Sequence, residues 1–496
     1  MKKYFLALIC GLLFPFGFAP FEAWPVTIIS LSLLLYLLKH EESKGSFLTG
    51  LIYGMGLWGV GISWVYVSIH YHGNQGIISS LLITFAFVIF LSLYIGFTTY
   101  LFAIFKTKIN SLNYLLIFPV IWVSIEVLRS NFLTGFPWLI IGTSLAGTPI
   151  GGWTPILGTY GSSLVVLMIS GCLLLIYEKR NKLDLYPTLL ILIILISSFT
   201  LNKINWTNEI TKVTTSIYQP NLTLQKKWSS QGIKHTMSLI GEAITNAEEN
   251  EFIFFPETAL ILEKEELEPW LTNIEKQLNE KNISLLSGII AKDPNEMDLI
   301  ERFNRVRGFG PLKGHYDKVH LVPFGEYLPF EKTLSKFGLK KITRGYNSFS
   351  SGDVRTTISL GNKFGEKLIL PLICYEIIYS GKIKTRKQFP DLVINISEDA
   401  WFGQSIGPYQ HFAKAIYRSV EEGVFIARSA NKGISAFIDP NGRAIKSLNI
   451  NESGSIEYKM PSFSKLTLFS NYGNKIFFLI ILLYIFLIFI FKKLKI

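Results

Sequence analysis

Charged residues are scarce in this chain. Asp, Glu, Lys and Arg make up 17% of the 496 residues, and hydrophobic residues make up 49%. A soluble domain usually carries about 25% charged residues. The shortfall lies within the first 200 residues and the last 25, which excludes a wholly soluble protein. The composition predicts a transmembrane bundle at 1–203, a soluble domain at 204–472, and a C-terminal transmembrane helix with a basic tail at 473–496.

Lysine and arginine are absent from every second loop between the apolar runs. The loops 21–23, 70–76 and 130–156 contain neither residue. Because positively charged loops stay in the cytoplasm, both chain ends are predicted to be cytoplasmic and the soluble domain periplasmic, in a multi-pass protein of a bacterial inner membrane. The predicted spans lie near 4–20, 24–39, 46–69, 77–105, 112–129, 157–177, 184–202 and 475–492. The basic residues that flank them are Lys2, Lys3, Lys39, Lys44, Lys106, Lys108, Lys179, Arg180, Lys182, Lys492, Lys493 and Lys495.

This topology also accounts for the net charge of +12, so no nucleic-acid partner is predicted.

Cysteine is rare as well. Cys10 and Cys172 lie inside apolar runs, and Cys374 is the one cysteine of the soluble domain. Cys374 therefore has no disulfide partner there, and a lone thiol outside the cytoplasm calls for a functional explanation. His70 and His72 are close in sequence, but no cysteine or carboxylate pair accompanies them, so neither a metal site nor a cofactor is predicted.

The soluble domain alternates short β-rich runs with helical patterns, which predicts a layered α/β domain. The predicted strands are at 213–219, 252–257, 283–290, 367–374, 391–397, 424–430 and 434–439, and the predicted helices are near 229–249, 264–280 and 407–422.

Three residues of this domain could carry chemistry, and each has a plainer interpretation. Cys374 ends an apolar strand, where a nucleophile would project from a strand-to-helix turn, but a single cysteine is more often buried and inert. Glu257, after the apolar run FIFFP, could be a general base or the start of a helix. Lys318 could stabilise an oxyanion or be a solvated surface lysine.

Taken together, Glu257, Lys318 and Cys374 resemble the nitrilase superfamily. Their flanking segments resemble one membrane-bound family within it, the apolipoprotein N-acyltransferases. One departure is Glu398, because the family often has Asn before the Asp of DAWFG. The fold that the resemblance implies is a multi-span α-helical membrane bundle plus a nitrilase-like αββα sandwich outside the cytoplasm. The segments that carry the resemblance are FFPETA, YDKVHLVPFGEYLP, ICYE, DAWFGQSIGPYQH, RSANKGISAFIDPNG and, in the membrane part, SWVYVSIH and FLTGFPW.

The resemblance implies transfer of an acyl chain from a phospholipid, typically phosphatidylethanolamine, to the α-amino group of the diacylated N-terminal cysteine of a lipoprotein. It implies that Glu257 takes the proton of Cys374, which then forms a thioester. Lys318 and a backbone N–H near Tyr375 would stabilise the oxyanion. The supporting residues implied are Trp228, Asn304, Glu326, Tyr375, Glu376 and Trp401.

Several supporting residues also have alternative interpretations. Trp228 could be a packed surface aromatic instead of a substrate-stacking one. Glu326 and Glu376 could form structural ion pairs. Trp401 and Phe402 could be ordinary core aromatics instead of a lid over an acyl chain.

Two rival functions stay open. A membrane-tethered amidase or nitrile hydrolase would use the same three residues, because they do not encode the acyl acceptor. A transporter with an outer ligand-binding domain would need polar or broken helices. Within the bundle, Glu126 and Arg129 are predicted to pair on one helix face. The G-x-G-x-x-G pattern of Gly54, Gly56 and Gly59 has no strand before it and is predicted to serve helix packing.

Overall fold

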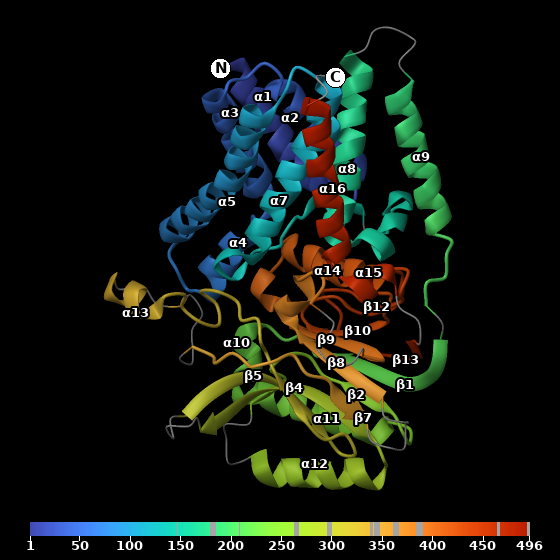
Figure 1. Cartoon of the computed structure of the whole chain (residues 1–496). Coiled ribbons are helices and arrows are strands. Elements are labelled where there is room, and N and C mark those ends of the chain that lie inside the picture. The colour runs from blue at the N-terminus through green and yellow to red at the C-terminus, as the bar shows by residue number, and fades with distance from the viewer. Residues whose placement is uncertain are drawn as a thin grey trace.

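The computed structural model places a helical bundle at one end of the molecule and a two-sheet domain at the other (Figure 1). It describes residues 1–145, 147–178, 185–207, 209–261, 267–294, 300–337, 341, 348–360, 367–382, 390–463 and 467–493. Both chain ends lie at the end of the bundle farthest from the sheets. The basic loop residues Lys179, Arg180 and Lys182, with Lys495, lie outside the described residues.

Each predicted apolar run contains a helix. The bundle is built from α1 (Lys2–Leu13), α2 (Trp24–Leu38), α3 (Ser43–Gly61), α5 (Ile77–Phe105), α7 (Phe118–Asn131), α8 (Thr154–Glu178), α9 (Tyr186–Leu201) and α16 (Lys475–Lys493). Within the described chain, four segments are long and apolar enough to cross a membrane: Ile77–Phe105, Asn110–Thr134, Pro149–Glu178 and Lys475–Lys492. The number of spans in the bundle stays a prediction.

The third predicted span, 46–69, is not one straight helix. It ends at Gly61, and the segment Trp64–His72, which contains α4 (Trp64–Val67) and η2 (Ser68–His72), leaves it at 54°. Counted as one bent span, this pair makes a fifth candidate among the described residues. The helices α2 and α9 have 15 and 16 residues. At about 1.5 Å per residue, both are shorter than a hydrocarbon core of about 30 Å.

Two glycines bring α3 against its neighbours. A Cβ atom at Gly56 would lie 2.5 Å from the carbonyl oxygen of Leu8 in α1, and one at Gly54 would lie 2.9 Å from Cα of Ser92 in α5. Helix backbones approach this closely only where no side chain intervenes. Gly54 and Gly56 therefore serve helix packing, as the sequence predicts, whereas a Cβ atom at Gly59 would meet open space.

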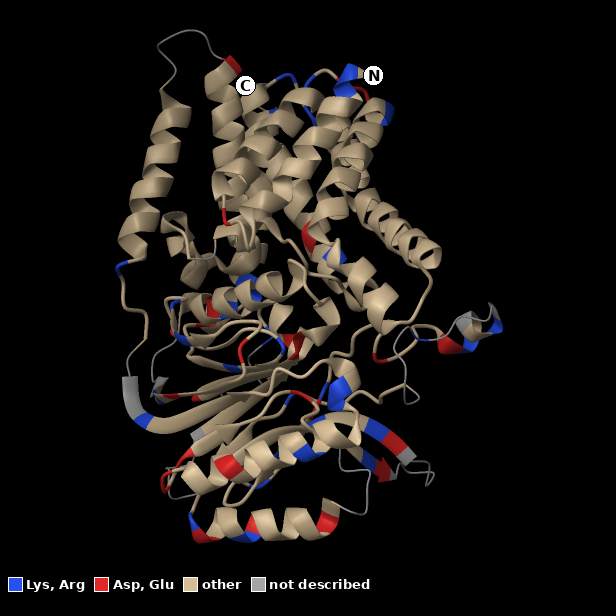
Figure 2. Cartoon of the chain, turned by 180° about the vertical axis from the view of Figure 1, so that it is seen from behind, with Lys and Arg blue, Asp and Glu red and all other residues tan. Residues whose placement is uncertain are grey.

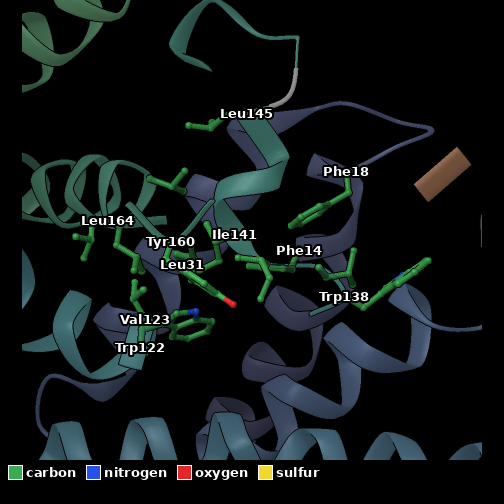
Figure 3. Close-up of a cluster of buried hydrophobic side chains, with 14 of the residues drawn as sticks. Phe14, Phe18, Leu31, Trp122, Val123, Trp138, Ile141, Leu145, Tyr160 and Leu164 are labelled. Carbon is green, nitrogen blue, oxygen red and sulfur yellow. The ribbon is translucent and has the colours of Figure 1, made fainter. Parts of the chain in front are cut away.

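The loop between α7 and α8 is part of the core of the bundle. Its residues Trp138, Ile141 and Leu145 are buried and lie among side chains such as Phe14 and Leu31 (Figure 3). The loop contains the short helices η4 (Phe132–Thr134), η5 (Ile141–Leu145) and η6 (Pro149–Trp153). This apolar loop forms part of the bundle surface on which the sheet domain packs.

The described part of the domain contains two sheets. A seven-stranded sheet has the order β13–β1–β2–β4–β5–β6, with β3 paired to β4, and a six-stranded sheet has the order β12–β11–β10–β9–β8–β7. The first comprises β1 (Glu209–Gln219), β2 (Phe252–Phe254), β3 (Leu260–Ile261), β4 (Ser284–Pro294), β5 (Ile300–Phe309), β6 (His315–Asp317) and β13 (Gly454–Phe463). The second comprises β7 (Ile358–Leu360), β8 (Lys367–Ile373), β9 (Leu392–Glu398), β10 (Ile426–Asn431), β11 (Ser435–Ile438) and β12 (Ala444–Leu448).

Side-chain alternation sorts these strands into layers. In β2, Phe252 and Phe254 face the core between the two sheets, while Ile253 faces α11 (Ser230–Asn246) and α12 (Glu268–Glu280). In β9, Ile394 faces the same inter-sheet core, while Val393 faces α14 (Gly407–Glu422) and the bundle. The layers are therefore helix, sheet, sheet, helix, which confirms the predicted αββα sandwich, with α14 between the second sheet and the bundle (Figure 1).

Charge separates the two parts of the molecule. Figure 2 shows that the helices of the bundle carry few charged residues along their length, while such residues gather near the chain ends and over the sheet domain. This is the distribution expected of helices surrounded by hydrocarbon.

Candidate active site

Cys374 lies where β8 ends and the short helix η10 (Cys374–Ile378) begins. The turn that the sequence predicts is therefore present. The backbone φ of Cys374 is +49°, a left-handed conformation that costs a residue with a side chain roughly 1–3 kcal/mol. Such a conformation persists only where surrounding contacts hold it, so the contacts of this turn bear directly on its function.

A cluster of buried polar side chains from the first sheet faces this turn. Lys318 Nζ lies 2.9 Å from Glu326 Oε1 and 3.4 Å from Glu257 Oε1. Asn304 Nδ2 donates to the same two oxygens, at 2.8 Å to Glu326 and 2.6 Å to Glu257. The backbone N–H of Glu398 donates to the other oxygen of Glu257 at 2.8 Å. Two carboxylates thus share one ammonium group and one amide.

The plainer interpretations of two residues are wrong. Glu257 lies in the turn between β2 and β3 and begins no helix. Lys318 follows β6 and is 1% exposed, so it is not a solvated surface lysine. The first sheet supplies Glu257, Asn304 and Lys318, the second supplies Cys374, and the site is assembled where the two sheets meet.

Electrostatics keep the thiol protonated at rest. Burial raises the pKa of the Cys374 thiol well above its ordinary value, the Glu257 carboxylate adds to the rise, and the Lys318 ammonium opposes it. Burial by itself would lower the pKa of Lys318, but the carboxylates of Glu326 and Glu257 outweigh it and raise that pKa. The thiol therefore needs a base before it can attack, and the ammonium stays charged.

Glu376 ties the nucleophile turn to the lysine segment. Its Oε2 accepts a hydrogen bond at 2.9 Å from the N–H of Ile373, the residue before the thiol. Its Oε1 accepts from the N–H groups of Val319 and His320, at 3.0 and 3.2 Å, directly after Lys318. The Glu376 carboxylate therefore bridges the two sheets at the site through these hydrogen bonds.

Glu376 is also in an ion pair, which agrees with the plainer interpretation of this residue. Arg355 lies 3.2 Å from it, and Tyr316 donates its hydroxyl at 2.6 Å. Burial would raise the pKa of Glu376, but Arg355 and Tyr316 outweigh burial and lower that pKa. The carboxylate is therefore ionised at neutral pH.

One buried ion pair next to Glu257 was not predicted from the sequence. Lys227 and Glu398 are 5% and 3% exposed, and Lys227 Nζ donates to the Glu398 carboxylate. The same ammonium donates at 2.7 Å to the main-chain oxygen of Glu257 and at 2.8 Å to Thr258 Oγ1. Glu398 replaces the Asn usual in the family, and Lys227 is the counter-charge that makes a carboxylate tolerable there.

Replacing Lys227 alone should destabilise the protein strongly. Lys227→Met leaves the Glu398 carboxylate buried without a counter-charge, which should lower the free energy of unfolding by about 3–5 kcal/mol. Thermal unfolding of the full chain in detergent measures the change. The double variant Lys227→Met with Glu398→Gln should recover most of it, and a double variant as unstable as the single one would show that the ion pair is not the cause.

A second network of buried, hydrogen-bonded side chains lies next to Cys374. The sequence did not predict that these residues interact. Asp399 accepts from Arg428 Nη2 at 2.7 Å and lies 2.9 Å from His411 Nδ1. Burial would raise the pKa of Asp399, but Arg428 and His411 outweigh it and hold that pKa well below the usual range.

The thiol, this carboxylate and the imidazole lie within 4.8 Å of one another. Arg428 already neutralises the carboxylate, which disfavours a cation there. The signal that could have indicated this network is Arg428, a charged residue within the apolar run VFIARSA.

The segment of Trp401 and Phe402 bridges the domain and the bundle. It forms η11 (Asp399–Phe402), and Ser68 Oγ in the bent helix pair donates to the Trp401 carbonyl at 2.8 Å. The rings of Trp401 and His72 meet edge to face at 5.4 Å, and those of Phe402 and Trp64 at 4.7 Å. The two aromatics therefore contact membrane helices and are not confined to the core of the domain.

Tyr375 and Trp228 have different surroundings. The Tyr375 hydroxyl donates at 3.1 Å to the carbonyl of Gly135, in the loop between α7 and α8. The residue after the nucleophile thus touches the bundle directly. Trp228 follows Lys227 at the end of α10 (Leu224–Lys227) and is 39% exposed, so it is not a core aromatic.

The charged pair in α7 has partners other than those predicted. Glu126 Oε1 accepts from the N–H of Ile141 at 2.9 Å, and Arg129 Nη1 donates to the carbonyl of Trp138 at 2.9 Å. Glu126 Oε1 also accepts from the Trp122 indole of the same helix at 3.3 Å, and in the described chain no hydrogen bond joins Glu126 and Arg129 directly. The physical reason is that buried irregular backbone needs hydrogen-bonding partners, which hydrocarbon cannot supply.

Comparisons with known proteins agree with this architecture. Residues 10–172 match the apolipoprotein N-acyltransferase N-terminal domain, and residues 214–461 match the carbon-nitrogen hydrolase family. An apolipoprotein N-acyltransferase of Coxiella burnetii is 32% identical over 452 residues, covering 90% of this chain and 91% of that protein. One of Wigglesworthia glossinidia brevipalpis is 34% identical over 457 residues, covering 89% and 88%. Among solved structures, Saccharomyces cerevisiae Nit3, a member of branch 10 of the nitrilase superfamily, is 16% identical and covers 51% of this chain and 91% of its own, with a TM-score of 0.37.

The helical bundle, the layered sheets and the match over residues 214–461 define a membrane-bound enzyme of the carbon-nitrogen hydrolase family. The relatives that share more than 30% identity cover nearly the whole of both chains. The chain belongs to the apolipoprotein N-acyltransferase family, and it is an N-acyltransferase of a bacterial membrane.

Proposed function

We propose that the protein moves an acyl chain from a phospholipid to the α-amino group of the diacylated N-terminal cysteine of a lipoprotein, through a thioester on Cys374. The observation that carries the proposal is the assembly of one thiol, one ammonium and two carboxylates where the two sheets meet, beside a residue that contacts the bundle. Glu257 and Lys318 both act electrostatically on the thiol. The hydrogen bond of Tyr375 to Gly135 keeps the site next to the membrane helices.

In the first half-reaction, Glu257 accepts the proton of Cys374 and the thiolate attacks the ester carbonyl of the phospholipid. A carbon–sulfur bond forms, the ester carbon–oxygen bond breaks, and Glu257 returns the proton to the departing alkoxide, which leaves as the lysophospholipid. Lys318 and the N–H of Tyr375 stabilise the oxyanion.

In the second half-reaction, the α-amino group of the lipoprotein attacks the thioester. Glu257 accepts a proton from the amine, an amide bond forms, and the thiol is regenerated when that proton reaches the sulfur. Water must be excluded while the thioester exists, and the packing of Trp401 and Phe402 on the bent helix pair supports such a role for this segment. The remaining supporting residues in this proposal are Glu326, Asn304, Glu376 and Trp228.

The domain limits and the topology belong to the proposal too. The bundle would comprise 1–203, the catalytic domain 204–472 and the last span 473–496, with both ends cytoplasmic and the catalytic domain periplasmic. The near absence of charge along the bundle supports this arrangement (Figure 2). Protease added to spheroplasts should digest the sheet domain and spare the chain ends, and the reverse pattern would contradict the orientation.

The full chain in mixed micelles tests the reaction. Incubation with a phospholipid should add one acyl mass to the peptide that contains Cys374, and a diacylated lipopeptide should discharge that adduct. The proposed donor is phosphatidylethanolamine, and phosphatidylglycerol is the comparison. Efficient hydrolysis of small amides without any transfer to the lipopeptide would favour the membrane-tethered amidase instead.

The acylation rate should not follow the ordinary titration of a thiol. Because the pKa of Cys374 is raised, the thiol stays protonated through the range of about 8–9 in which free cysteine ionises. The rate should therefore be flat across that range. Single-turnover acylation between about pH 4 and 10 measures the profile. A rate that rises tenfold per unit up to pH 9 would mean that a free thiolate, not base catalysis, limits acylation.

A further inference from the structure

The network behind Cys374 reaches the main chain of the nucleophile itself. His411, on α14, donates from Nε2 to the carbonyl oxygen of Cys374 at 3.2 Å. Asp399 lies against the other ring nitrogen at 2.9 Å, and Arg428 holds Asp399 at 2.7 Å. All three side chains are at most 1% exposed. A single buried contact therefore links this network to the peptide group that joins Cys374 to Tyr375.

The orientation of that peptide group decides where the Tyr375 N–H points. In a trans peptide the C=O and N–H bonds point in opposite directions, so a donor that holds the carbonyl also fixes the amide. Tyr375 is the second residue of η10, where a helix offers no acceptor for the N–H. The amide is therefore available to a ligand on the side of the peptide away from His411.

We propose that His411 is a positioning residue that aims the Tyr375 N–H at the oxyanion formed on the substrate carbonyl. This inference rests on the proposed acyl transfer through Cys374. Asp399 and Arg428 hold the imidazole in place, and the imidazole holds the carbonyl of a residue whose φ of +49° needs such support. The proton of the thiol still goes to Glu257, so His411 touches neither the substrate nor the transferred proton.

The helix that carries His411 is anchored on its other side in the bundle. Gln410 Oε1 accepts from the Trp138 indole at 2.7 Å, and Lys414 Nζ donates to Thr143 Oγ1 at 3.0 Å. The position of the imidazole thus depends on how the domain sits on the membrane helices. Helix α14 therefore contributes both to the packing of the sheet domain on the bundle and to the geometry of the oxyanion site.

Two conservative variants separate this role from simple packing. In His411→Gln the side-chain amide nitrogen can take the place of Nε2 and still donate to the Cys374 carbonyl. In His411→Asn the amide can replace only Nδ1, so contact with Asp399 is kept and the bond to the carbonyl is lost. Both variants are compared with wild type as the full chain in mixed micelles.

Two reactions of the same thiol give the readout. Acylation by a phospholipid passes through an oxyanion, whereas alkylation by iodoacetamide displaces iodide and forms none. His411→Asn should slow acylation by about 100-fold, the loss expected for one oxyanion donor, and change alkylation of the Cys374 peptide by less than about threefold. His411→Gln should keep acylation within about tenfold of wild type.

Equal losses of acylation and alkylation in His411→Asn would overturn the inference, because they would mean that the whole site is disturbed. Wild-type acylation in His411→Asn would overturn it as well. A wild-type chain that forms no acyl adduct would instead overturn the proposed function, and this inference with it.

Discussion

Cys374→Ala should abolish acyl transfer, with a loss of at least about 10⁴-fold, and leave no acyl adduct on the protein. The loss is this large because the variant removes the atom that forms the thioester, and among the described residues Cys374 is the one thiol on which Glu257 and Lys318 act electrostatically. Mass spectrometry of the intact chain after incubation with phospholipid, together with the transfer assay, measures both effects. Cys374→Ser should also form no adduct, because a buried hydroxyl is harder to deprotonate than a thiol.

The two other cysteines provide the matched control. Cys10 and Cys172 are buried in α1 and α8, and the double variant Cys10→Ala with Cys172→Ala should acylate at close to the wild-type rate. An acyl adduct that persists in Cys374→Ala, or that disappears in the double variant, would place the nucleophile elsewhere.

Glu257→Gln should slow acylation by about 10²–10⁴-fold, the range expected for loss of a general base. The thiol is protonated at rest because burial and the Glu257 carboxylate raise its pKa, so attack requires that this carboxylate accept the proton. The amide of glutamine cannot do so. Alkylation of Cys374 by iodoacetamide should slow as well, because that reaction also needs the thiolate. Single-turnover acylation is the direct measurement.

Glu251→Gln is the control for this variant. Glu251 directly precedes β2, whereas Glu257 follows it, and it is similarly buried at 4% exposure. Its carboxylate accepts a hydrogen bond from the N–H of Glu248 at 3.0 Å. Among the described residues, the hydrogen bonds of Glu251 do not reach the Cys374 thiol. Acylation should be unchanged in Glu251→Gln. Acylation at the wild-type rate in a folded Glu257→Gln variant would show that another group accepts the proton.

Much of the fold is predictable because it depends on short repeating patterns. The apolar runs locate the bundle helices, and in β9 the predicted strand at 391–397 corresponds to Leu392–Glu398. The predicted helix at 407–422 corresponds to α14, Gly407–Glu422. The bend after Gly61 was not predicted, because the apolar run continues through it and composition does not register a change of direction.

The candidate site was predicted in its residues but not in its contacts. Cys374 and Glu257 stand out because each ends an apolar strand, and Lys318 stands out because its segment, like theirs, resembles a known family. Lys227 was overlooked, because a lysine in a short polar helix looks like a surface residue until the fold buries it. The pair of Glu126 and Arg129 was misassigned because helical spacing favours a local partner, while the loop after α7 offered backbone groups that needed partners more.

By itself the sequence determined where the helices and strands lie, which residue is the lone thiol of the sheet domain, and which family the chain resembles, since these properties are encoded within a few neighbouring residues. The tertiary structure alone decided which charges meet. Lys227 and Glu398 are 171 positions apart, and His411 and Cys374 are 37 apart. Such contacts arise when two sheets and a helical bundle pack together, because a buried charge or carbonyl takes whichever partner the packing brings within reach.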